Sequence, residues 1–589
     1  MFDAVLIANR GEIAIRIARA CRELGVRSVG VYSEADRDAP HVAACDEAYL
    51  LGAAPASESY LAIDKVVEVA RRAGVDAIHP GYGFLAENAD FAQAVADAGL
   101  TFIGPPPAAI AAMGDKLSAR AVALAAGVPV VPGTLEPTDD PEVAMAFGDE
   151  YGYPVAVKAM FGGGGRGMKV VRTREEMRDA LIAARRESEA AFGRGECYLE
   201  RYLERPRHVE IQVLADLDGS TIYLGERDCS LQRRHQKLVE EAPAPGVSEE
   251  LRAAMGEAAV RVAREMGYTN AGTCEFLLDE DGRTFYFLEM NTRLQVEHPV
   301  TELVTGVDLA QAQLRIASGE GIGLTQEDVV LRGHAIEVRI NAEEPAAGFV
   351  PTPGTIGAFA APLGPWVRFD TGAAPGYTVP REYDSMIGKL IVWASDRDGA
   401  RARMSRALDE LVIEGLPTTV PFHRLAMVHP QFAAGEHATS SVEREWDLSE
   451  LTPQAVGAGP DAAPDTGREV TVEVDGRRLA VRLFGDLPAA GAAAPAGGTS
   501  PRRRKARSGG GGGAAPSGDD LTAPMQGTVI EVAVEVGATV AAGDTLLVLE
   551  AMKMENAVKA HRAGVVTALP VSAGEVVQPG AVLARIEDA

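Results

Sequence analysis

The sequence predicts a multidomain fold that combines an α/β N-terminal region, a mixed α and β core and a small all-β C-terminal domain. At 589 residues the chain is too long for one hydrophobic core. Apolar strand-like runs alternate with amphipathic helical patterns near the N-terminus, and the C-terminal segment repeats one pattern of glycine and apolar residues. We expect five segments, with bounds at 1–107, 108–330, 331–446, 447–520 and 521–589.

The composition limits the possible partners and the compartment. A formal net charge of -27 works against binding to nucleic acid or to an anionic membrane surface. The 5 cysteines are scattered without metal-ligand spacing, which fits a reducing cytoplasm better than a disulfide framework. Glu12, Arg16 and Arg19 interrupt the apolar N-terminus, and no apolar run is long enough to span a membrane. We therefore expect a cytoplasmic protein with no nucleic acid and no membrane among its partners.

The first segment, 1–107, alternates apolar runs with helical patterns. The runs VLIA, SVGVYS and AIHP are expected to be strands, and IAIRIARACREL and IDKVVEVARRAG are expected to be helices. This alternation predicts a parallel sheet with helices on both faces.

The second segment, 108–330, carries a glycine-rich run, FGGGGRGMKVV, which includes Gly163, Gly164, Gly165 and Gly167. Residues without a Cβ let backbone N–H groups close over phosphate oxygens, although such runs also form plain flexible loops. The run is not a Walker A motif, because no Gly-Lys-Ser/Thr follows it. Lys158, on the expected strand just before the run, adds a cation. The pattern favours a site for nucleotide phosphates.

Two acidic residues and an amide in the same segment suggest a metal site. Glu275 and Glu289 stand in EFLL and FYFLEMN, which look like adjacent strands, and Asn291 follows Glu289 closely. Carboxylate and amide oxygens suit Mg²⁺, which also bridges phosphates. Two exposed carboxylates without a metal remain the alternative.

Further charged residues follow at once. Alternation places Arg293, Gln295 and Glu297 on one face of an expected extended segment. With Arg339 from HAIEVRINAEE, the set supplies two cations and a carboxylate. Such a set is suited to binding a small oxyanion and removing its proton.

The third and fourth segments differ in character. Segment 331–446 mixes the expected strands HAIEVRI and KLIVWA with the expected helix ARARMSRALDELVI. Segment 447–520 is rich in Ala, Gly, Pro and Asp, with one hairpin pattern that turns at Asp475-Gly476. The rest of it cannot bury enough apolar surface to offset its ordering entropy, which predicts a flexible linker.

The last segment, 521–589, contains an internal repeat. Gly527, Gly537 and Gly543 recur 37 residues later as Gly564, Gly574 and Gly580. Two short β-rich halves with matching turns predict a small pseudo-twofold barrel or sandwich. Lys553 lies between the halves in Ala-Met-Lys-Met, so we expect it at an exposed hairpin tip. Most exposed lysines have no special role, but this position suits a group that swings between distant sites.

The stretch EAMKMENAV around Lys553 resembles the biotin carboxyl carrier domain, in which the lysine of AMKM bears biotin through an amide. A lipoyl domain shares this fold but usually has an acidic residue before its lysine and alanine after it. The resemblance covers 521–589 and implies covalent biotin on Lys553, attached by a biotin protein ligase.

Residues 1–446 resemble the ATP-grasp core of biotin carboxylase. The motifs ANRGEIA, HPGYGFLAEN, RDCSLQRRHQK and NTRLQVEHPVTE carry this resemblance. It implies cofactor-binding roles for Lys116, Lys158, Glu200, Leu203, His208, His235, Gln295 and Tyr82. Arg201 stands where the family commonly has lysine, and Ala86 where serine is usual. The first departure leaves open how the adenine edge is contacted.

The resemblance also implies the reaction. Biotin is carboxylated from bicarbonate at the expense of ATP with Mg²⁺, or with Mn²⁺ in its place. Glu297 would remove the proton of bicarbonate, while Arg293 and Arg339 hold the anion. Lys237 and His235 would stabilise the transferring phosphoryl group.

The same resemblance implies partners. Arg16 and Arg19 match positions at the family's dimer interface, which implies a homodimeric carboxylase core. No segment resembles a carboxyltransferase, so that half is expected on a separate beta subunit. Fusion of carboxylase and carrier resembles the alpha subunits of acyl-CoA carboxylases. The short stretch between them favours the acetyl-/propionyl-CoA type over forms with a full subunit-docking domain.

Three alternatives stay open. One is an ATP-grasp ligase for a different carboxylate, which has no use for AMKM. Another is a split pyruvate carboxylase subunit, although such subunits usually separate carboxylase from carrier. The third is a non-enzymatic biotin scaffold, which would have lost its metal or oxyanion residues.

Overall fold

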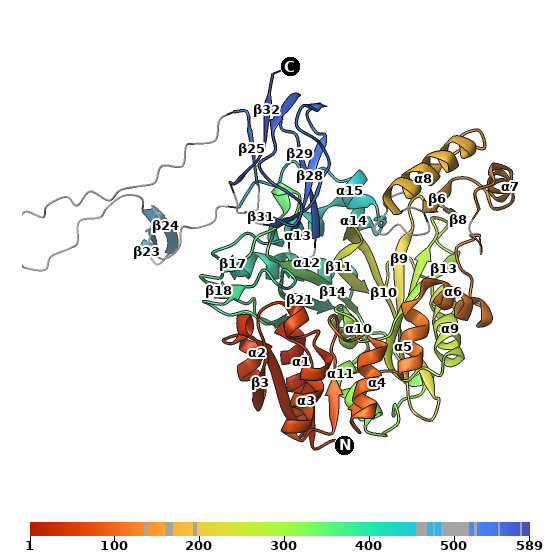
Figure 1. Ribbon diagram of the computed structural model, residues 1–589. Helices are drawn as coiled ribbons and strands as arrows, with labels where there is room; N and C mark the ends of the chain where they lie inside the picture. The colour runs from red at the N-terminus through yellow and green to blue at the C-terminus, as the bar shows by residue number, and fades with distance from the viewer. Residues whose placement is uncertain are drawn as a thin grey trace, which may run out of the picture. The chain divides into compact units, whose positions relative to one another are not determined.

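The computed structural model describes residues 1–134, 136, 138–159, 169–192, 197–454, 468–474, 477–483, 518–523, 527–551, 554–577 and 580–588 (Figure 1). These residues fall into two compact units. The first comprises Met1–Phe349, Pro353–Ile413 and Thr418–Pro453, and the second comprises Val350–Thr352, Glu414–Pro417 and Gln454–Ala589. Among the helices described, none has both the length and the apolar character needed to cross a membrane.

A parallel sheet forms the N-terminal part of the first unit (red in Figure 1). Its strands are β1 (Ala4–Ile7), β2 (Arg27–Ser33), β3 (Glu47–Gly52), β4 (Ala77–His79) and β5 (Thr101–Phe102), in the order β3-β2-β1-β4-β5. The helices are α1 (Gly11–Glu23), α2 (Pro40–Ala44), α3 (Ile63–Ala73) and α4 (Ala89–Asp97).

Alternate residues of β1 enter different hydrophobic cores. Val5 and Ile7 pack in the core that contains the buried face of α1, whereas Leu6 packs in the core that contains residues of α3 and α4. The predicted parallel sheet with helices on both faces is confirmed.

A small three-stranded sheet follows, flanked in sequence by helices. The strands are β6 (Val155–Ala159), β7 (Lys169–Val171) and β8 (Cys197–Arg201), and β6 lies between the other two in antiparallel pairing. The helices are α5 (Pro107–Gly114), α6 (Lys116–Ala125), α7 (Pro141–Tyr151) and α8 (Met177–Phe192). The core under this sheet includes Phe147 of α7 and Leu181 of α8.

The first unit also contains an eight-stranded antiparallel sheet. Its strands lie in the order β13-β12-β9-β10-β11-β14-β21-β19. Its strands are β9 (Arg207–Ala215), β10 (Thr221–Arg233), β11 (Gln236–Ala242), β12 (Asn270–Leu278), β13 (Phe285–Asn291), β14 (His334–Asn341), β19 (Val367–Thr371) and β21 (Met386–Ala394). The sheet continues without a break from the expected second segment into the third, because β11 pairs with β14.

Helices and short strands complete this unit. The helices are α9 (Glu249–Glu265), α10 (His298–Thr305), α11 (Leu309–Ala317), α12 (Arg397–Glu410), α13 (Val420–Val428), α14 (Pro430–Ala434) and α15 (Ser441–Arg444). The short strands of the first unit are β15 (Glu343–Glu344), β17 (Gly354–Thr355), β18 (Phe359–Ala360), β20 (Thr378–Val379) and β22 (Val412–Ile413), whereas β16 (Val350–Pro351) belongs to the second unit. Helix α12 confirms the helix expected in the third segment.

The second unit contains the expected hairpin and a β-rich C-terminal domain. Strands β23 (Arg468–Val474) and β24 (Arg477–Leu483) pair antiparallel on either side of Asp475-Gly476, which lie outside the described residues. The expected flexible linker lies largely outside them as well.

The C-terminal domain consists of two four-stranded sheets. Its strands are β25 (Asp520–Thr522), β26 (Gly527–Val532), β27 (Thr539–Val540), β28 (Thr545–Ala551), β29 (Met554–Lys559), β30 (Gly564–Ala568), β31 (Val576–Val577) and β32 (Val582–Glu587). One sheet has the order β25-β32-β30-β27 and the other β29-β28-β26-β31.

The predicted repeat is confirmed down to the register of its strands. Asp520 of β25 pairs with Arg585 of β32, and a shift of 37 residues converts that pair into Ala557 of β29 with Val548 of β28. Glycine recurs for a steric reason, because a Cβ would lie 2.7 Å from the carbonyl oxygen of Glu550 at Gly527 and 2.2 Å from that of Glu587 at Gly564.

Candidate active site

Two of the three predicted metal ligands face each other across adjacent strands. Glu275 of β12 lies opposite Glu289 of β13 in the antiparallel register, so both side chains project from one face of the sheet. Asn291 ends β13 and is buried. The donor set of two carboxylates and an amide oxygen fits Mg²⁺.

Lys237 of β11 joins three carboxylates beside this pair. Its Nζ donates to Oε2 of Glu210 at 2.7 Å, to Oε1 of Glu275 at 2.9 Å and to Oε1 of Glu297 at 2.6 Å. Burial works to lower the pKa of Lys237, but the three carboxylates outweigh it and raise the pKa well above its ordinary value. The lysine is therefore a fixed positive charge at the centre of the site.

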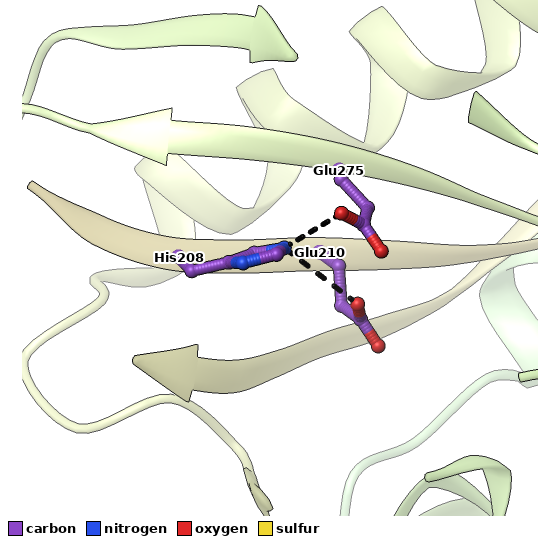
Figure 2. Close-up of side chains that lie close together, drawn as sticks. All are labelled: His208, Glu210 and Glu275. Atoms are coloured by element: carbon purple, nitrogen blue, oxygen red, sulfur yellow. Dashed lines mark ion pairs between the residues drawn. The ribbon is translucent and has the colours of Figure 1, made fainter. Parts of the chain in front are cut away.

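A histidine approaches the same carboxylates from β9, as Figure 2 shows. Nε2 of His208 lies 2.9 Å from Oε2 of Glu275 and 4.0 Å from Oε2 of Glu210. Burial works to lower the pKa of His208, while the charge of Glu275 prevails and raises it. The three residues have the chemistry of a metal site, and Glu275 also belongs to the carboxylate pair described above.

The carboxylate of Glu297 is fully buried, with an exposed fraction of 0%. Besides Lys237, it accepts a hydrogen bond at Oε2 from Nη2 of Arg339 at 2.9 Å. Burial works to raise its pKa, but Lys237, Arg339 and Arg227 hold the pKa well below its usual range. Glu297 is therefore ionised at neutral pH and ready to accept a proton.

The segment around Glu297 is not extended, contrary to expectation. The chain bends at Arg293 and turns before α10, where Glu297 is the N-cap with φ -83° and ψ 10°. Helix α10 starts immediately afterwards with proline in its first turn, which favours this compact turn over a strand. Gln295 still reaches the site and donates to Glu275 at 3.3 Å, whereas Nε of Arg293 pairs with Glu87 at 2.9 Å.

The expected nucleotide residues are placed in part. Lys158 of β6 forms an ion pair with Glu200 of β8. Leu203 is buried against Val131 and Tyr286. The side chain of Lys116 at the start of α6, together with Gly163, Gly164, Gly165 and Gly167, lies outside the described residues.

The structure also places the two departures from the family pattern, Arg201 and Ala86, and two further predicted residues, His235 and Tyr82. Arg201 donates to the hydroxyl of Tyr286 at 2.8 Å and to Asp279 at 3.1 Å. Ala86 is buried. His235 is exposed at the turn between β10 and β11, with φ 63°. The hydroxyl of Tyr82 donates to Glu12.

The remaining predicted residues are Arg16 and Arg19, expected at a dimer interface, and Lys553, expected to carry biotin. Arg16 is buried in ion pairs with Glu302 and Asp308 of its own chain, and Arg19 is exposed. Lys553 lies outside the described residues, between β28 and β29, which pair antiparallel with Ala551 opposite Met554.

Comparisons with known proteins show the family of the chain. Family models match residues 1–110 (biotin carboxylase, N-terminal domain), 115–325 (carbamoyl-phosphate synthase L chain, ATP binding domain), 337–444 (biotin carboxylase C-terminal domain) and 519–586 (biotin-requiring enzyme). The biotin-dependent acyl-coenzyme A carboxylase alpha3 subunit of Mycobacterium leprae is 50% identical over 99% of this chain and 98% of its own. The chain belongs to the family of biotin-dependent acyl-CoA carboxylase alpha subunits.

Other relatives and solved structures match three quarters of the chain. Biotin carboxylase 1 of Bacillus subtilis is 53% identical over 75% of this chain and 98% of its own. A crystal structure of Campylobacter jejuni biotin carboxylase with a β,γ-ATP compound aligns with a TM-score of 0.69 at 46% identity, covering 75% of this chain and 99% of that one. The biotin carboxylase domain dimer of Hydrogenobacter thermophilus 2-oxoglutarate carboxylase, with MgADP and bicarbonate, aligns with a TM-score of 0.69 at 48% identity, covering 75% and 97%. The alpha subunit is thus an ATP-dependent biotin carboxylase with biotin, ATP and Mg²⁺ as its cofactors.

The structure adds acidic residues that the sequence analysis did not select. Glu210 and His208 are two residues apart on β9, so strand alternation was the signal that placed them on one face. Glu87 belongs to HPGYGFLAEN, but its partner Arg293 is 206 residues away, and no local pattern joins them. Glu240 of β11 accepts a hydrogen bond from Nε of Arg339 at 2.6 Å.

Proposed function

We propose that this alpha subunit carboxylates biotin attached to its own Lys553 and delivers the carboxyl group to a separate carboxyltransferase beta subunit. The acceptor on that subunit is acetyl-CoA or propionyl-CoA. The observation that carries the proposal is the joint contact of Lys237 and Arg339 with the buried carboxylate of Glu297. The full-length match to an acyl-coenzyme A carboxylase alpha3 subunit supports the class of acceptor. Homodimerisation of the carboxylase core is part of the proposal, since a neighbouring structure is a dimer of this domain.

Glu297 is the base that removes the proton of bicarbonate. Arg339 and Arg293 hold the anion beside it. The pKa of Glu297 is low because Lys237 and Arg339 both pair with it, although burial opposes them. When either cation turns to bicarbonate, that stabilisation weakens and the pKa of Glu297 rises. Binding of the substrate thus strengthens the base that acts on it.

The nucleotide half of the site has its own set of residues. Glu275, Glu289 and Asn291 would hold Mg²⁺, which would neutralise the negative charge of the nucleotide phosphates. The side chains assigned to the nucleotide are Lys116, Lys158, Glu200, Leu203 and His208, with Gly163, Gly164, Gly165 and Gly167 over the phosphates. Lys237 and His235 balance charge on the transferring phosphoryl group. Tyr82 and Gln295 line the side that receives biotin.

A reconstitution experiment tests the proposal. The purified chain should hydrolyse ATP in the presence of bicarbonate and free biotin, yet fix no labelled bicarbonate into acetyl-CoA or propionyl-CoA. Adding a carboxyltransferase subunit should restore fixation and set the preference between the two thioesters. Fixation into either thioester by the chain alone would refute the half-enzyme assignment.

The attachment of biotin and the class of acceptor need their own controls. After co-expression with a biotin protein ligase, intact mass should show one biotin, lost in Lys553→Arg and kept in Lys559→Arg. The acceptor panel includes pyruvate, because a pyruvate carboxylase subunit of Methanothermobacter thermautotrophicus is 53% identical over 75% of this chain and 90% of its own. Fixation into pyruvate with no fixation into acyl-CoA would replace the proposed acceptor.

A further inference from the structure

A second buried carboxylate holds the guanidinium of Arg339. Nε of Arg339 donates to Oε1 of Glu240 at 2.6 Å, while Nη2 donates to Oε2 of Glu297 at 2.9 Å. The exposed fraction of each carboxylate is 0%. The arginine therefore bridges two carboxylates that come from different elements, and only Glu297 is the proposed base.

Glu240 has an acidic neighbour on the adjacent strand. Glu337 of β14 lies directly opposite it in the antiparallel register, so the two side chains share one face of the sheet. Glu337 is also fully buried. Within the described residues, neither oxygen of Glu337 nor Oε2 of Glu240 has a hydrogen-bond partner. Lys389, the nearest cation across β14 and β21, is engaged by Glu12 at 3.0 Å and by the carbonyl of Val296 at 2.7 Å.

Two ionised carboxylates are not stable in that position. A buried carboxylate without hydrogen bonds carries a large desolvation cost and takes up a proton instead. Burial raises the pKa of Glu337 well above its ordinary value, with Lys389 opposing and Glu240 adding to the rise. Burial also raises the pKa of Glu240 to about 7, with Arg339 opposing. A protonated Glu337 needs an acceptor, and Oε2 of Glu240 is a buried acceptor directly across the strands.

We propose that Glu240 is a positioning residue for Arg339 and that it shares a single proton with Glu337. The inference rests on the proposed role of Arg339 in holding bicarbonate. Its consequence is that Arg339 can exchange Glu297 for the substrate at Nη2 while Nε stays bonded to Glu240. The guanidinium keeps its orientation, and its charge stays balanced after Glu297 has taken the proton.

Charged groups from every neighbouring element bear on this pair. Arg339, Glu297 and Lys237 face Glu240 from β14, the turn before α10 and β11 itself. Cys229 of β10 also lies within electrostatic range of Glu240. Lys389 of β21 faces Glu337. Arg339 also pairs with Glu297, and Lys389 also pairs with Glu12, so neither cation neutralises both Glu240 and Glu337. One proton on the two carboxylates restores the charge balance.

Three variants of the full-length chain separate this proposal from a purely structural role. Glutamine has the shape of a protonated carboxyl, so Glu337→Gln keeps the donor to Glu240 and should leave kcat/KM for bicarbonate within about threefold of the unchanged chain. Glu240→Gln removes the charge next to Nε and should lower kcat/KM for bicarbonate about tenfold or more, with the affinity for Mg·ATP unchanged. Glu241→Gln is the matched control, because that buried residue points to the other face and pairs with His334 and Arg397. It should reduce thermal stability and leave kcat/KM within about twofold.

Infrared difference spectroscopy reads the shared proton without any activity. The unchanged chain at neutral pH should show the carbonyl stretch of a protonated carboxyl, and Glu337→Gln should lose it. Absence of that band, or equal kinetic losses in Glu337→Gln and Glu240→Gln, would overturn the proposal. Near-normal kcat/KM in Glu240→Gln would do so too. If the unchanged chain cleaved no ATP in response to bicarbonate, the proposed function itself would fail, while the infrared result would still report on the proton.

Discussion

Glu297 meets a different cation at each of its two oxygens. Lys237 contacts Oε1 from β11 and Arg339 contacts Oε2 from β14, so the carboxylate sits between two strands of one sheet. A neutral amide cannot reproduce this arrangement, since one of its two terminal atoms is itself a donor. The position therefore demands a carboxylate for electrostatic reasons, independently of its proposed role as a base.

Replacement of Glu297 by glutamine tests both aspects. We expect bicarbonate-dependent ATP cleavage by Glu297→Gln to fall by about 10² or more, because the proton acceptor is lost. Binding of Mg·ATP, measured by calorimetry, should persist. Glu302→Gln is a suitable control, since Glu302 is buried on α10 and pairs with Arg16 and Arg368 rather than with the site. Near-normal turnover in Glu297→Gln would assign the base to another group.

The buried His79 should make the free energy of unfolding depend on pH. Burial lowers the pKa of His79 from 6.5 to about 3. Between these values the unfolded chain binds a proton at His79 that the folded chain does not, so this residue destabilises the fold as the pH falls below 6.5. Asparagine can still accept the N–H of Gly81, which bonds to Nδ1 at 3.0 Å.

The variant His79→Asn should therefore behave differently with pH. Its deficit in free energy of unfolding, relative to the unchanged chain, should shrink by about 2 kcal/mol between pH 7 and pH 5. Denaturant titrations of both proteins at the two pH values measure this. A deficit that stays constant or grows on acidification would contradict the assignment of a neutral buried imidazole.

At the scale of elements, strand register decides which residues meet. The register between β10 and β11 shifts between the pairs Leu231–Val239 and Gln232–Lys237, which leaves Leu238 as an extra residue. Such a bulge puts Lys237 and Glu240 on one face although they are three positions apart. Strict alternation would have placed them on opposite faces.

The regularity of strand pairing decides which residues of the site could be predicted from the sequence. Glu275 and Glu289 were predictable because two apolar strand patterns follow each other closely along the chain, although the pairing of the two strands shifts register directly beside these residues. The turn at Glu297 was not, since alternating residue types imitate a strand there while the following helix imposes a bend. Nor was Glu240, because a bulge leaves no period in the sequence. The parallel sheet and the duplicated domain were predictable because their periods are long and regular.

The carrier domain offers a steric test of the repeat. At Gly564 a Cβ would lie 2.2 Å from the carbonyl oxygen of Glu587, an atom that cannot move without disturbing the sheet. Gly564→Ala should destabilise the domain by about 1–3 kcal/mol, and Gly527→Ala should act in the same direction. Gly518→Ala is the control, because nothing lies within 4 Å of a Cβ there. Thermal unfolding of the three variants measures the effect, and equal stability of Gly564→Ala and Gly518→Ala would contradict it.

At the scale of the whole molecule, two units with separate cores must cooperate in one reaction. The eight-stranded sheet gathers the acidic and basic residues of the carboxylase in the first unit. The sequence expected to carry biotin belongs to the second. The segment 485–520, which precedes the domain that contains Lys553, lies largely outside the described residues, and its composition predicts a flexible linker.

Shortening the segment 485–520 should leave transfer of the carboxyl group unaffected until the remaining segment is too short for the carrier to reach the site. If 485–520 is the flexible linker that its composition predicts, its root-mean-square reach would be roughly 30–35 Å. Deleting half of it should cost little, whereas near-total deletion should block transfer of the carboxyl group from bicarbonate to the carrier. Cleavage of ATP with free biotin should be unaffected in both cases, which serves as the internal control. Full transfer after near-total deletion would show that the reach of this chain is not needed.

The duplication of the carrier domain also has a mechanical consequence. The loop that holds Lys553 joins β28 to β29, and its symmetry counterpart would join β32 to β25, but there the polypeptide enters and leaves the domain. The rest of the chain is therefore attached at the β25–β32 end of the domain, and the β28–β29 end, which holds Lys553, is not attached to it. With biotin attached at Lys553, as proposed, the domain lies between the linker and the biotin. The length of the domain then adds to the distance over which biotin can move.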